Sequence, residues 1–165
     1  MKIIRLRKKV IFLSSLLIIT SFLVCRACFA EDIVLSEGQT IYVPVYSHIY
    51  VMKGHSFELA ISLSIRNTDP DESVTIQSVR YYDSDGQLIR NYVESPMQLK
   101  PMASTHFFVS ESDKSGGFGA SFIVKWNSRS KVNEPIVEGV MAGTKSGQGI
   151  SFISRGKPIQ EKSRK

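Results

Sequence analysis

Beyond residue 30 the sequence contains no cysteine, because its two cysteines are Cys25 and Cys28. A fold built from the later residues therefore has no disulfide, and packing alone must hold it together. The same absence excludes a thiolate ligand, and with it a blue-copper site, from that part of the chain. Histidine is also scarce: the three are His48, His55 and His106, and no two stand at a recognised metal-ligand spacing.

No segment after residue 30 has the period of an amphipathic helix. Phe57–Arg66 instead alternates in steps of two, with large apolar side chains at the odd-numbered positions and polar or small ones at the even positions. A strand sends successive side chains to opposite faces. This pattern therefore predicts a half-buried strand of an antiparallel sheet, with its odd-numbered residues in a core beside Trp126.

Other short segments are rich in β-branched and aromatic residues and are separated by turn-forming residues. Together they predict an all-β fold, an antiparallel immunoglobulin-like or fibronectin-like β-sandwich of about seven to eight strands, preceded by a signal peptide. A parity change between Ile76 and Val79 predicts a β-bulge, Asp83–Gly86 a hairpin turn, and Asn127–Asn133 a polar loop. Pro44 predicts a sheet edge or a bend. The expected strands are Gln39–Val51, Phe57–Arg66, Val74–Tyr82, Gln87–Val93, Thr105–Ser110, Ala120–Trp126, Pro135–Ala142 and Gly149–Ser154.

The first thirty residues follow the order of a secretory signal peptide: a basic start, an apolar run and a short segment with small residues. The apolar run, Val10–Val24, is about fifteen residues long, whereas a membrane span needs about twenty. We therefore expect cleavage after Ala30 and a periplasmic or secreted protein that contacts the membrane only through this segment before cleavage. The alternatives are a retained N-terminal membrane anchor and a lipoprotein modified at Cys28, although Cys25 stands where a bacterial lipobox has an aliphatic residue.

Charge is distributed unevenly along the chain. The sequence has 21 Lys and Arg against 15 Asp and Glu, and six of the basic residues but none of the acids lie in the first thirty positions. Without those six, basic and acidic residues balance, so the overall basic character is no argument for nucleic-acid binding. The expected organisation is a signal peptide at 1–30, one β-sandwich domain at 31–154 and a disordered charged tail at 155–165.

Three patterns resemble ligand sites, and each has a simpler structural interpretation. Met52 stands near His55, as in methionine-rich copper sites, but scattered methionines usually fill a core. Asp69–Glu72 and Asp83–Gly86 resemble calcium loops without the terminal bidentate glutamate. Ser115–Ala120 resembles a phosphate-binding loop, but we expect a strand after it rather than the required helix. The sequence therefore predicts no metal and no cofactor.

No catalytic residue emerges from the sequence. Ser47 precedes His48, but neighbours in a strand point to opposite faces and would not form a catalytic dyad. The Gly-x-Ser-x-Gly turn that holds some serine nucleophiles does not occur. Two hypotheses remain: a non-catalytic module that binds an unknown protein or glycan of the cell envelope, and a small metal-binding or enzymatic domain that uses His48 and neighbouring polar residues.

One segment suggests where binding would occur. If Gln39–Val51 is a single extended strand, its aliphatic residues face the core and a row of mostly aromatic residues lies on the opposite face. That row contains Tyr42, Tyr46, His48 and Tyr50. Tyrosine offers a large ring and a polar tip at low entropic cost, so the row indicates a binding face. The alternative is that these rings cap the second half of the core.

Longer runs of the sequence are specific as a set. They are GQTIYVPVYSHIY, LSIRNTD, VRYYDSDGQLIRNY, GGFGASFIVKW and PIVEGVMAG followed by GQGISFISRG. These runs span nearly all of residues 38–156 and resemble the family of small exported bacterial proteins called domain of unknown function 3124. The resemblance implies a single exported domain, and it brings no activity, ligand or catalytic residue.

The order of the first thirty residues predicts a mature protein that begins at Glu31. N-terminal sequencing of exported material should give Glu31 as the first residue. A product that retains Ile11–Val24, or one that carries a lipid on Cys28, would contradict this expectation.

Overall fold

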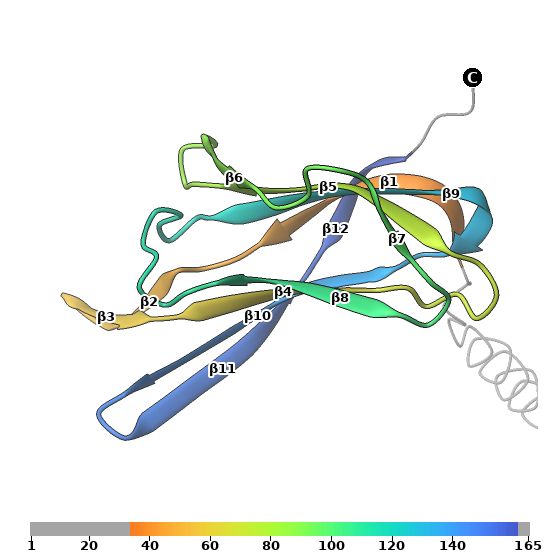
Figure 1. Ribbon diagram of the computed structural model, residues 1–165. Helices are drawn as coiled ribbons and strands as arrows, with labels where there is room; N and C mark the ends of the chain where they lie inside the picture. Colours follow the sequence, from red (N-terminus) through yellow and green to blue (C-terminus); the bar gives the residue numbers. More distant parts are fainter. Residues whose placement is uncertain (1–33, 162–165) are drawn as a thin grey trace, which may run out of the picture. The chain divides into compact units, whose positions relative to one another are not determined.

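The computed structural model describes residues 34–161, in which every regular element is a β-strand (Figure 1). The predicted signal peptide at 1–30 lies outside the described residues. No helix long and apolar enough to cross a membrane occurs in the described part. The strands are β1 (Leu35–Pro44), β2 (His48–Met52), β3 (His55–Glu58), β4 (Ala60–Arg66), β5 (Val74–Tyr82), β6 (Leu88–Asn91), β7 (Met97–Leu99), β8 (Ser104–Val109), β9 (Ser121–Asn133), β10 (Ile136–Lys145), β11 (Gln148–Arg155) and β12 (Lys157–Glu161).

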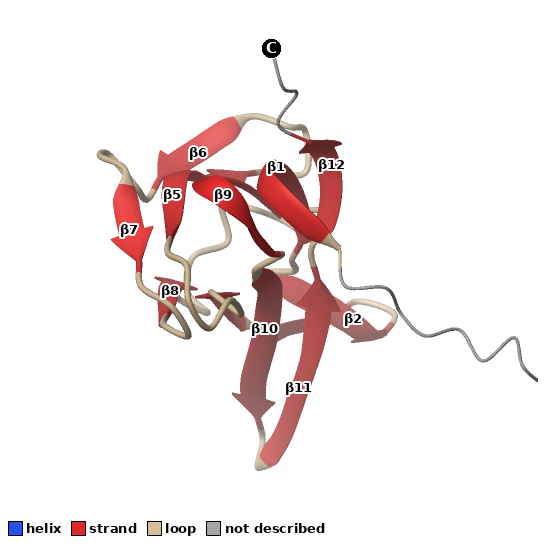
Figure 2. Ribbon diagram, turned by 90° about the vertical axis from the view of Figure 1, so that its right-hand side faces the viewer, coloured by secondary structure: helices blue, strands red, loops and turns tan. Residues whose placement is uncertain are grey.

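These strands form two main antiparallel sheets and a separate hairpin. The larger sheet has the order β12-β1-β9-β5-β6, with β7 also paired to β5, and the smaller sheet has the order β11-β10-β4-β8. Strands β2 and β3 make the hairpin. The two sheets face each other with the core between them (Figure 1, Figure 2). The predicted all-β, antiparallel class is thereby confirmed.

The alternation in Phe57–Arg66 is confirmed by burial. Its odd-numbered residues are all buried, and Trp126 of the opposite sheet belongs to the same core. The even-numbered residues are half-buried or exposed. The segment is nevertheless two strands, β3 and β4, because the Leu59 N–H leaves the ladder and donates to the Ser47 carbonyl at 2.9 Å.

The predicted β-bulge and hairpin turn are also present. The register between β5 and β9 shifts between Ile76 and Ser78, which lets both Ile76 and Val79 point into the core. In the following turn the Gly86 N–H donates to the Asp83 carbonyl at 3.1 Å, and Gly86 has a φ of 78°. The hairpin joins β5 to β6.

Other expected boundaries are wrong, and the described residues form twelve strands rather than seven to eight. Gln39–Val51 is not a single strand, because the chain leaves the ladder between Pro44 and His48. Asn127–Asn133 is not a loop but the second half of β9, which pairs with the start of β1 across a bulge at Ser36–Gly38. Short-range composition missed this half because its pairing partner lies almost a hundred residues away.

The charged tail expected to be disordered is ordered as far as Glu161. Residues Lys157–Glu161 form β12, which pairs with β1, and residues 162–165 lie outside the described residues. The chain passes from the smaller to the larger sheet at Gly156, whose N–H donates to the Val137 carbonyl at 2.8 Å. A Cβ at Gly156 would lie 2.6 Å from the Ile41 side chain, so the crossing requires glycine.

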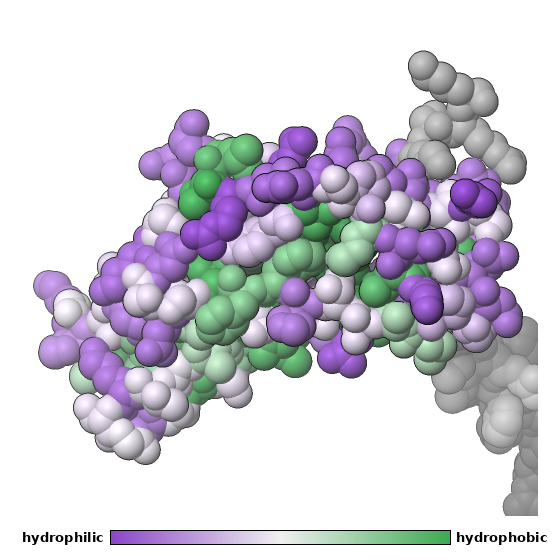
Figure 3. Space-filling view, viewed as in Figure 1, coloured by the Kyte–Doolittle hydropathy of each residue, from purple (hydrophilic) through white to green (hydrophobic). Residues whose placement is uncertain are grey.

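On one side, half-buried side chains rather than strands close the gap between the sheets. Figure 3 shows apolar residues gathered in a band between the two sheets, on the side of β6, β7 and β8. Tyr92 and Phe107 meet there with ring centroids 5.6 Å apart. These rings pack against the main core.

A buried polar hub fastens the loops at one end of the sheets. The Asn67 amide donates to carbonyls of Glu72 and Lys100, and the Asp69 carboxylate accepts the backbone N–H groups of Asp71, Glu72 and Asn133. These bonds, first of all the one from Asn133, hold the pKa of Asp69 below its usual value. Asp69 is therefore a carboxylate at neutral pH that joins its own loop to the end of β9.

Replacement of Leu63 by alanine should destabilise the fold by about 2–5 kcal/mol, because a fully buried side chain leaves a cavity. Ser62→Ala is the matched control, since Ser62 is the half-buried neighbour on the opposite face and should change little. Urea unfolding measures both. Equal losses for the two variants would contradict the assignment of faces.

Asp69→Asn should lower the urea midpoint at pH 7, because a neutral amide replaces the carboxylate that accepts three backbone N–H groups. The pKa of Asp69 is lower in the folded protein than in the unfolded chain, where it is about 3.9. Its ionised carboxylate therefore stabilises the fold fully above that unfolded-state pKa, and the stabilisation is lost as the pH falls through the folded-state pKa. The difference from the parent protein should therefore shrink below about pH 4. Asp71→Asn, an exposed change in the same loop, is the control. A difference that is the same at pH 3 and pH 7 would exclude this role.

Candidate functional site

The predicted aromatic row is divided by a break in the backbone after β1. At the break the Val45 N–H donates to the Ala120 carbonyl at 2.9 Å and the Ser47 N–H to the Gly117 carbonyl at 3.3 Å. The Ser47 carbonyl accepts from Leu59. The chain is thus held between the loop before β9 and the β3–β4 junction, and the residues after the break form a new surface.

Three of the four predicted residues meet on that surface, and they surround a fourth ring. Ring centroids lie 5.3 Å apart for Tyr46 and Phe118, 6.0 Å for His48 and Phe118, and 6.3 Å for Tyr50 and Phe118. The His48 and Tyr50 rings are also in contact, at 5.2 Å. We call Tyr46, His48, Tyr50 and Phe118 the aromatic cluster.

The aromatic cluster is partly open to solvent. Tyr50 is 64% exposed and Phe118 is 49% exposed, whereas Tyr46 and His48 are half-buried. Tyr46 also contacts Phe152 of β11, with centroids 5.9 Å apart. The inner rings are therefore anchored against the fold and the outer two present their faces to solvent.

Tyr42 does not join the cluster. It lies before the break, on β1, where it pairs with Ile123 on one side and Lys157 on the other, and no described ring contact links it to the cluster. Its side chain is 37% exposed. Phe118, in turn, was not among the predicted residues, because it belongs to a loop whose position depends on contacts distant in the sequence.

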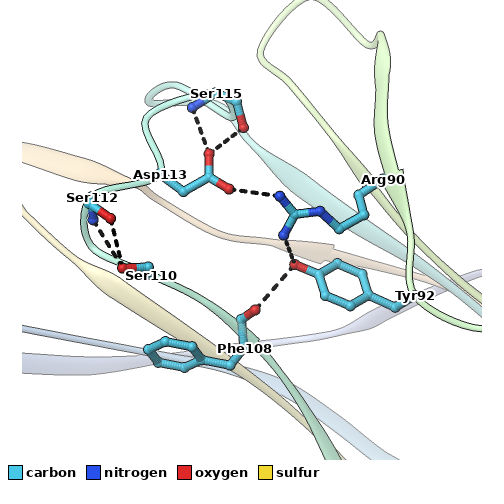
Figure 4. A network of polar contacts seen from close by, with 7 residues as sticks. All are labelled: Arg90, Tyr92, Phe108, Ser110, Ser112, Asp113 and Ser115. Carbon is cyan, nitrogen blue, oxygen red and sulfur yellow. Dashed lines mark hydrogen bonds and ion pairs between the residues drawn. The ribbon is translucent and has the colours of Figure 1, made fainter.

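That loop, residues 110–120, is held by a network of polar contacts (Figure 4). Arg90 of β6 forms an ion pair with Asp113 at 3.2 Å, and Asp113 also accepts hydrogen bonds from Ser115. The hydrogen bond from the Ser115 hydroxyl lowers the pKa of Asp113 and outweighs burial, which raises it, so this pKa lies below its usual value. Nearer the tip, Ser84 donates to the Gly116 carbonyl at 3.1 Å. The loop that carries Phe118 is thus held by β6 and by the turn between β5 and β6.

Ser47 and His48 are closer than expected from strand geometry, so the expectation that their side chains point to opposite faces is wrong. The Ser47 Oγ lies 3.1 Å from the His48 Nδ1, because these residues sit at the break rather than within a regular strand. The Ser47 hydroxyl donates its single proton to the Gly117 carbonyl at 2.9 Å. With that proton engaged, the Ser47 oxygen is free to accept from a protonated His48 Nδ1. This polarity is opposite to that of a serine nucleophile, which donates to its histidine.

Charged groups lie beside the rings. Glu58 is directly opposite His48 in the β2–β3 hairpin, and its Oε1 is 3.5 Å from the Lys114 ammonium. A hydrogen bond from Ser56 holds the pKa of Glu58 below its usual value, and Lys114 and His48 act in the same direction. The buried Glu58 Oε2 has no hydrogen-bond partner within residues 34–161. The site therefore combines exposed aromatic side chains with an adjacent ion pair, and the unpaired Glu58 oxygen is itself buried.

An apolar hollow of about 640 Å³ lies beside the cluster, between the β2–β3 and β10–β11 hairpins. It is lined by Val51, Met52, Phe57, Gln148, Gly149 and Ile150. Val51 and Met52 are mostly exposed. Exposed apolar side chains of β2 thus lie next to the aromatic cluster.

The other sequence patterns fall elsewhere. The Asp83 Oδ1 accepts the backbone N–H groups of Asp85 and Gln87, as a turn requires. Residues 115–120 lead directly into β9 and not into a helix. His106 lies on β8, away from the hairpin that carries His48 and His55. Within residues 34–161 no three His, Cys, Asp or Glu side chains converge as a metal site would require.

Comparison with known proteins identifies a family and brings no characterised relative. No curated protein matches the chain. Among solved structures, the chain is similar to one described as "Crystal Structure of Thermotoga maritima 1070", from Thermotoga maritima, with a TM-score of 0.46 and 13% sequence identity over 75% of this chain and 97% of that chain. A family model described as "Protein of unknown function (DUF3124)" matches residues 38–159, which include the whole aromatic cluster. The resemblance seen in the sequence is thereby confirmed, and the chain belongs to the DUF3124 family.

Proposed function

We propose that this protein is a non-catalytic binding module of the bacterial cell envelope and that the aromatic cluster is its binding face. The observation that carries the proposal is the meeting of Tyr46, His48 and Tyr50 around Phe118, with two of the four rings about half exposed or more. A structural role alone does not account for the outer two rings, because they cover little of the core. Exposed, clustered aromatic side chains are typical of recognition surfaces.

The cluster is suited to binding because its rings are already ordered. Tyr46 packs on Phe152, and the loop that carries Phe118 is tied to β6 through Arg90 and Asp113. Ligand binding would therefore immobilise few side chains, and each immobilised side chain costs about 0.5–1.5 kcal/mol. The preformed cluster reduces that entropic cost.

Polar groups beside the rings would orient a ligand. The half-buried His48 imidazole and Glu58 carboxylate flank the rings, and the exposed Lys114 ammonium is a donor. Sugar rings offer apolar C–H faces together with hydroxyl donors, and protein surfaces offer similar combinations. The expected partner is an envelope glycan or an envelope protein.

The proposal includes export and a finer description of the fold. We infer that residues 1–30 are a signal peptide that directs the chain to the periplasm or outside the cell, on the basis of their basic, apolar and small-residue order. We also infer that the two facing sheets are an immunoglobulin-like sandwich. The antiparallel pairing and the strand that changes sheet at Gly156 support this inference.

Tyr50→Ala and Phe118→Ala should each weaken binding to isolated cell-envelope material by about tenfold or more, since a recognition aromatic contributes about 2 kcal/mol. Binding is measured by co-sedimentation of the purified protein with envelope fragments. Treating the fragments with protease before the assay distinguishes a glycan, whose binding survives, from a protein.

Tyr42→Ala is the matched control, because Tyr42 is an exposed tyrosine outside the cluster. It should leave binding unchanged. All three variants should unfold within about 0.5 kcal/mol of the parent protein, as surface substitutions do. Equal loss of binding in the Tyr42 and Tyr50 variants, or no loss in either cluster variant, would refute the proposed face.

A further inference from the structure

The edges of the two sheets differ in how they are protected against pairing with another strand. Edge strand β12 carries Lys157, Pro158 and Glu161, and β6 is only four residues long. At β8 the backbone carbonyl of Phe108 accepts a hydrogen bond from the Tyr92 hydroxyl at 3.2 Å (Figure 4). Charges, proline, shortness and coverage are the usual means of blocking an edge.

Strand β11 lacks these protections over most of its length, since its one charged residue, Arg155, is the last. It is eight residues long and pairs with β10 alone among the described strands. Residues 149–154 contain neither a charge nor a proline, and Ile153 is 60% exposed. The β10–β11 hairpin extends away from the rest of the smaller sheet, with β11 on its outer side (Figure 2). An edge of this kind is a template for an added strand.

The turn of this hairpin shows which backbone groups are free. Ser146 and Gly147 have φ values of 53° and 78°, as in a two-residue type I′ turn, so Lys145 and Gln148 form a hydrogen-bonded pair. Hydrogen-bonded and non-hydrogen-bonded pairs alternate along the ladder. Gly156 is an even-numbered residue like Gln148, and its N–H donates to the Val137 carbonyl of β10, as this alternation requires. The N–H and C=O groups of Gly149, Ser151 and Ile153 therefore point away from β10.

We propose that β11 is a homodimerisation edge, which pairs antiparallel with β11 of a second copy across a two-fold axis at Ser151. Three of the free positions, Gly149, Ser151 and Ile153, are symmetric about Ser151, so Gly149 of one copy lies opposite Ile153 of the other and the hydrogen-bonding groups match; the fourth, Arg155, lies at the end of the strand. The result is one continuous eight-stranded sheet, made of two four-stranded sheets.

The side chains in this register are also complementary. Ile150 and Phe152 share the face of the buried Met141, which lies directly opposite Phe152 in the sheet. Both are only half-buried in the single chain. In the dimer each Ile150 lies opposite Phe152 of the second copy, in a non-hydrogen-bonded pair, where side chains approach most closely. The interface thus extends the inner apolar face of the sheet.

Charge favours a second copy as the occupant of this edge. Residues 34–161 contain nearly equal numbers of acidic and basic residues, and the edge itself is uncharged between Gly149 and Ser154. Two copies therefore approach without strong repulsion. An interface based on one strand pair is small, so we expect a dissociation constant of about 1–100 µM. The proposed interface meets the aromatic cluster at Phe152, which contacts Tyr46, whereas the Ser151 backbone groups that pair the strands contact no ring of the cluster, so changes at Ser151 test the dimer separately from the binding face.

Ser151→Pro tests the proposal without breaking the parent sheet, because the Ser151 N–H makes no bond to β10. Proline removes this donor from the free edge and should weaken self-association by about tenfold or more. Ser151→Ala keeps the donor and should dimerise like the parent protein. Sedimentation velocity over a concentration series of the purified exported protein measures the mass, and the urea midpoint shows that each variant is folded.

A cysteine cross-link tests the register. The test uses a full chain that carries Cys25→Ser and Cys28→Ser, so that Ser151→Cys introduces the only thiol. In the proposed dimer residue 151 of one copy lies opposite residue 151 of the other, with their Cα atoms about 5.5 Å apart, a separation that suits a disulfide. It should give a disulfide-linked dimer under mild oxidation, whereas Ser104→Cys, on the opposite edge of the same sheet, should not. A parent protein that is monomeric up to several hundred micromolar overturns the proposal. A folded Ser151→Pro variant that still dimerises, or equal cross-linking at both positions, overturns it as well.

Discussion

The backbone hydrogen bonds around Ser47 join parts of the chain that are otherwise far apart. Ser47 donates to the loop before β9 and accepts from Leu59, which ties the end of β1 to the junction of β3 and β4. Its buried hydroxyl bonds to the same loop and orients His48. If these bonds were absent, the loop and the β2–β3 hairpin would have no fixed relation, and the aromatic cluster would not form. A buried polar residue thus determines the position of the candidate site.

The two ends of the domain use polar groups differently. At one end Asn67 and Asp69 satisfy loop backbone groups, and all four side-chain oxygen and nitrogen atoms find partners there. At the other end the Glu58 Oε2 is left unpaired beside exposed rings. Unpaired buried atoms also occur away from the aromatic cluster, at the Gln39 Oε1 and the Ser130 Oγ among others, so such an atom does not by itself mark the candidate site.

The predictions that succeeded rest on local periodicity. Burial of the odd-numbered residues of Phe57–Arg66 follows from the two-residue repeat of a strand, and the bulge near Ile76 follows from a change in that repeat. The predictions that failed concern segments whose state depends on a distant partner. Asn127–Asn133 is polar like a loop but pairs with Leu35–Gly38, and the charged segment after Arg155 becomes β12 because β1 offers a free side. Backbone pairing of this kind leaves little trace in composition.

The candidate site shows the same division. The sequence by itself determined the all-β class, the core positions and the aromatic side chains that follow β1, because alternation and residue type are local properties. Only the tertiary structure decided that Tyr42 is separated from Tyr46, that Phe118 completes the cluster and that Ser47 contacts His48. The physical reason is the break after Pro44: hydrogen bonds to a loop some seventy residues away redirect the chain, and no pattern within Gln39–Val51 encodes the position of that loop.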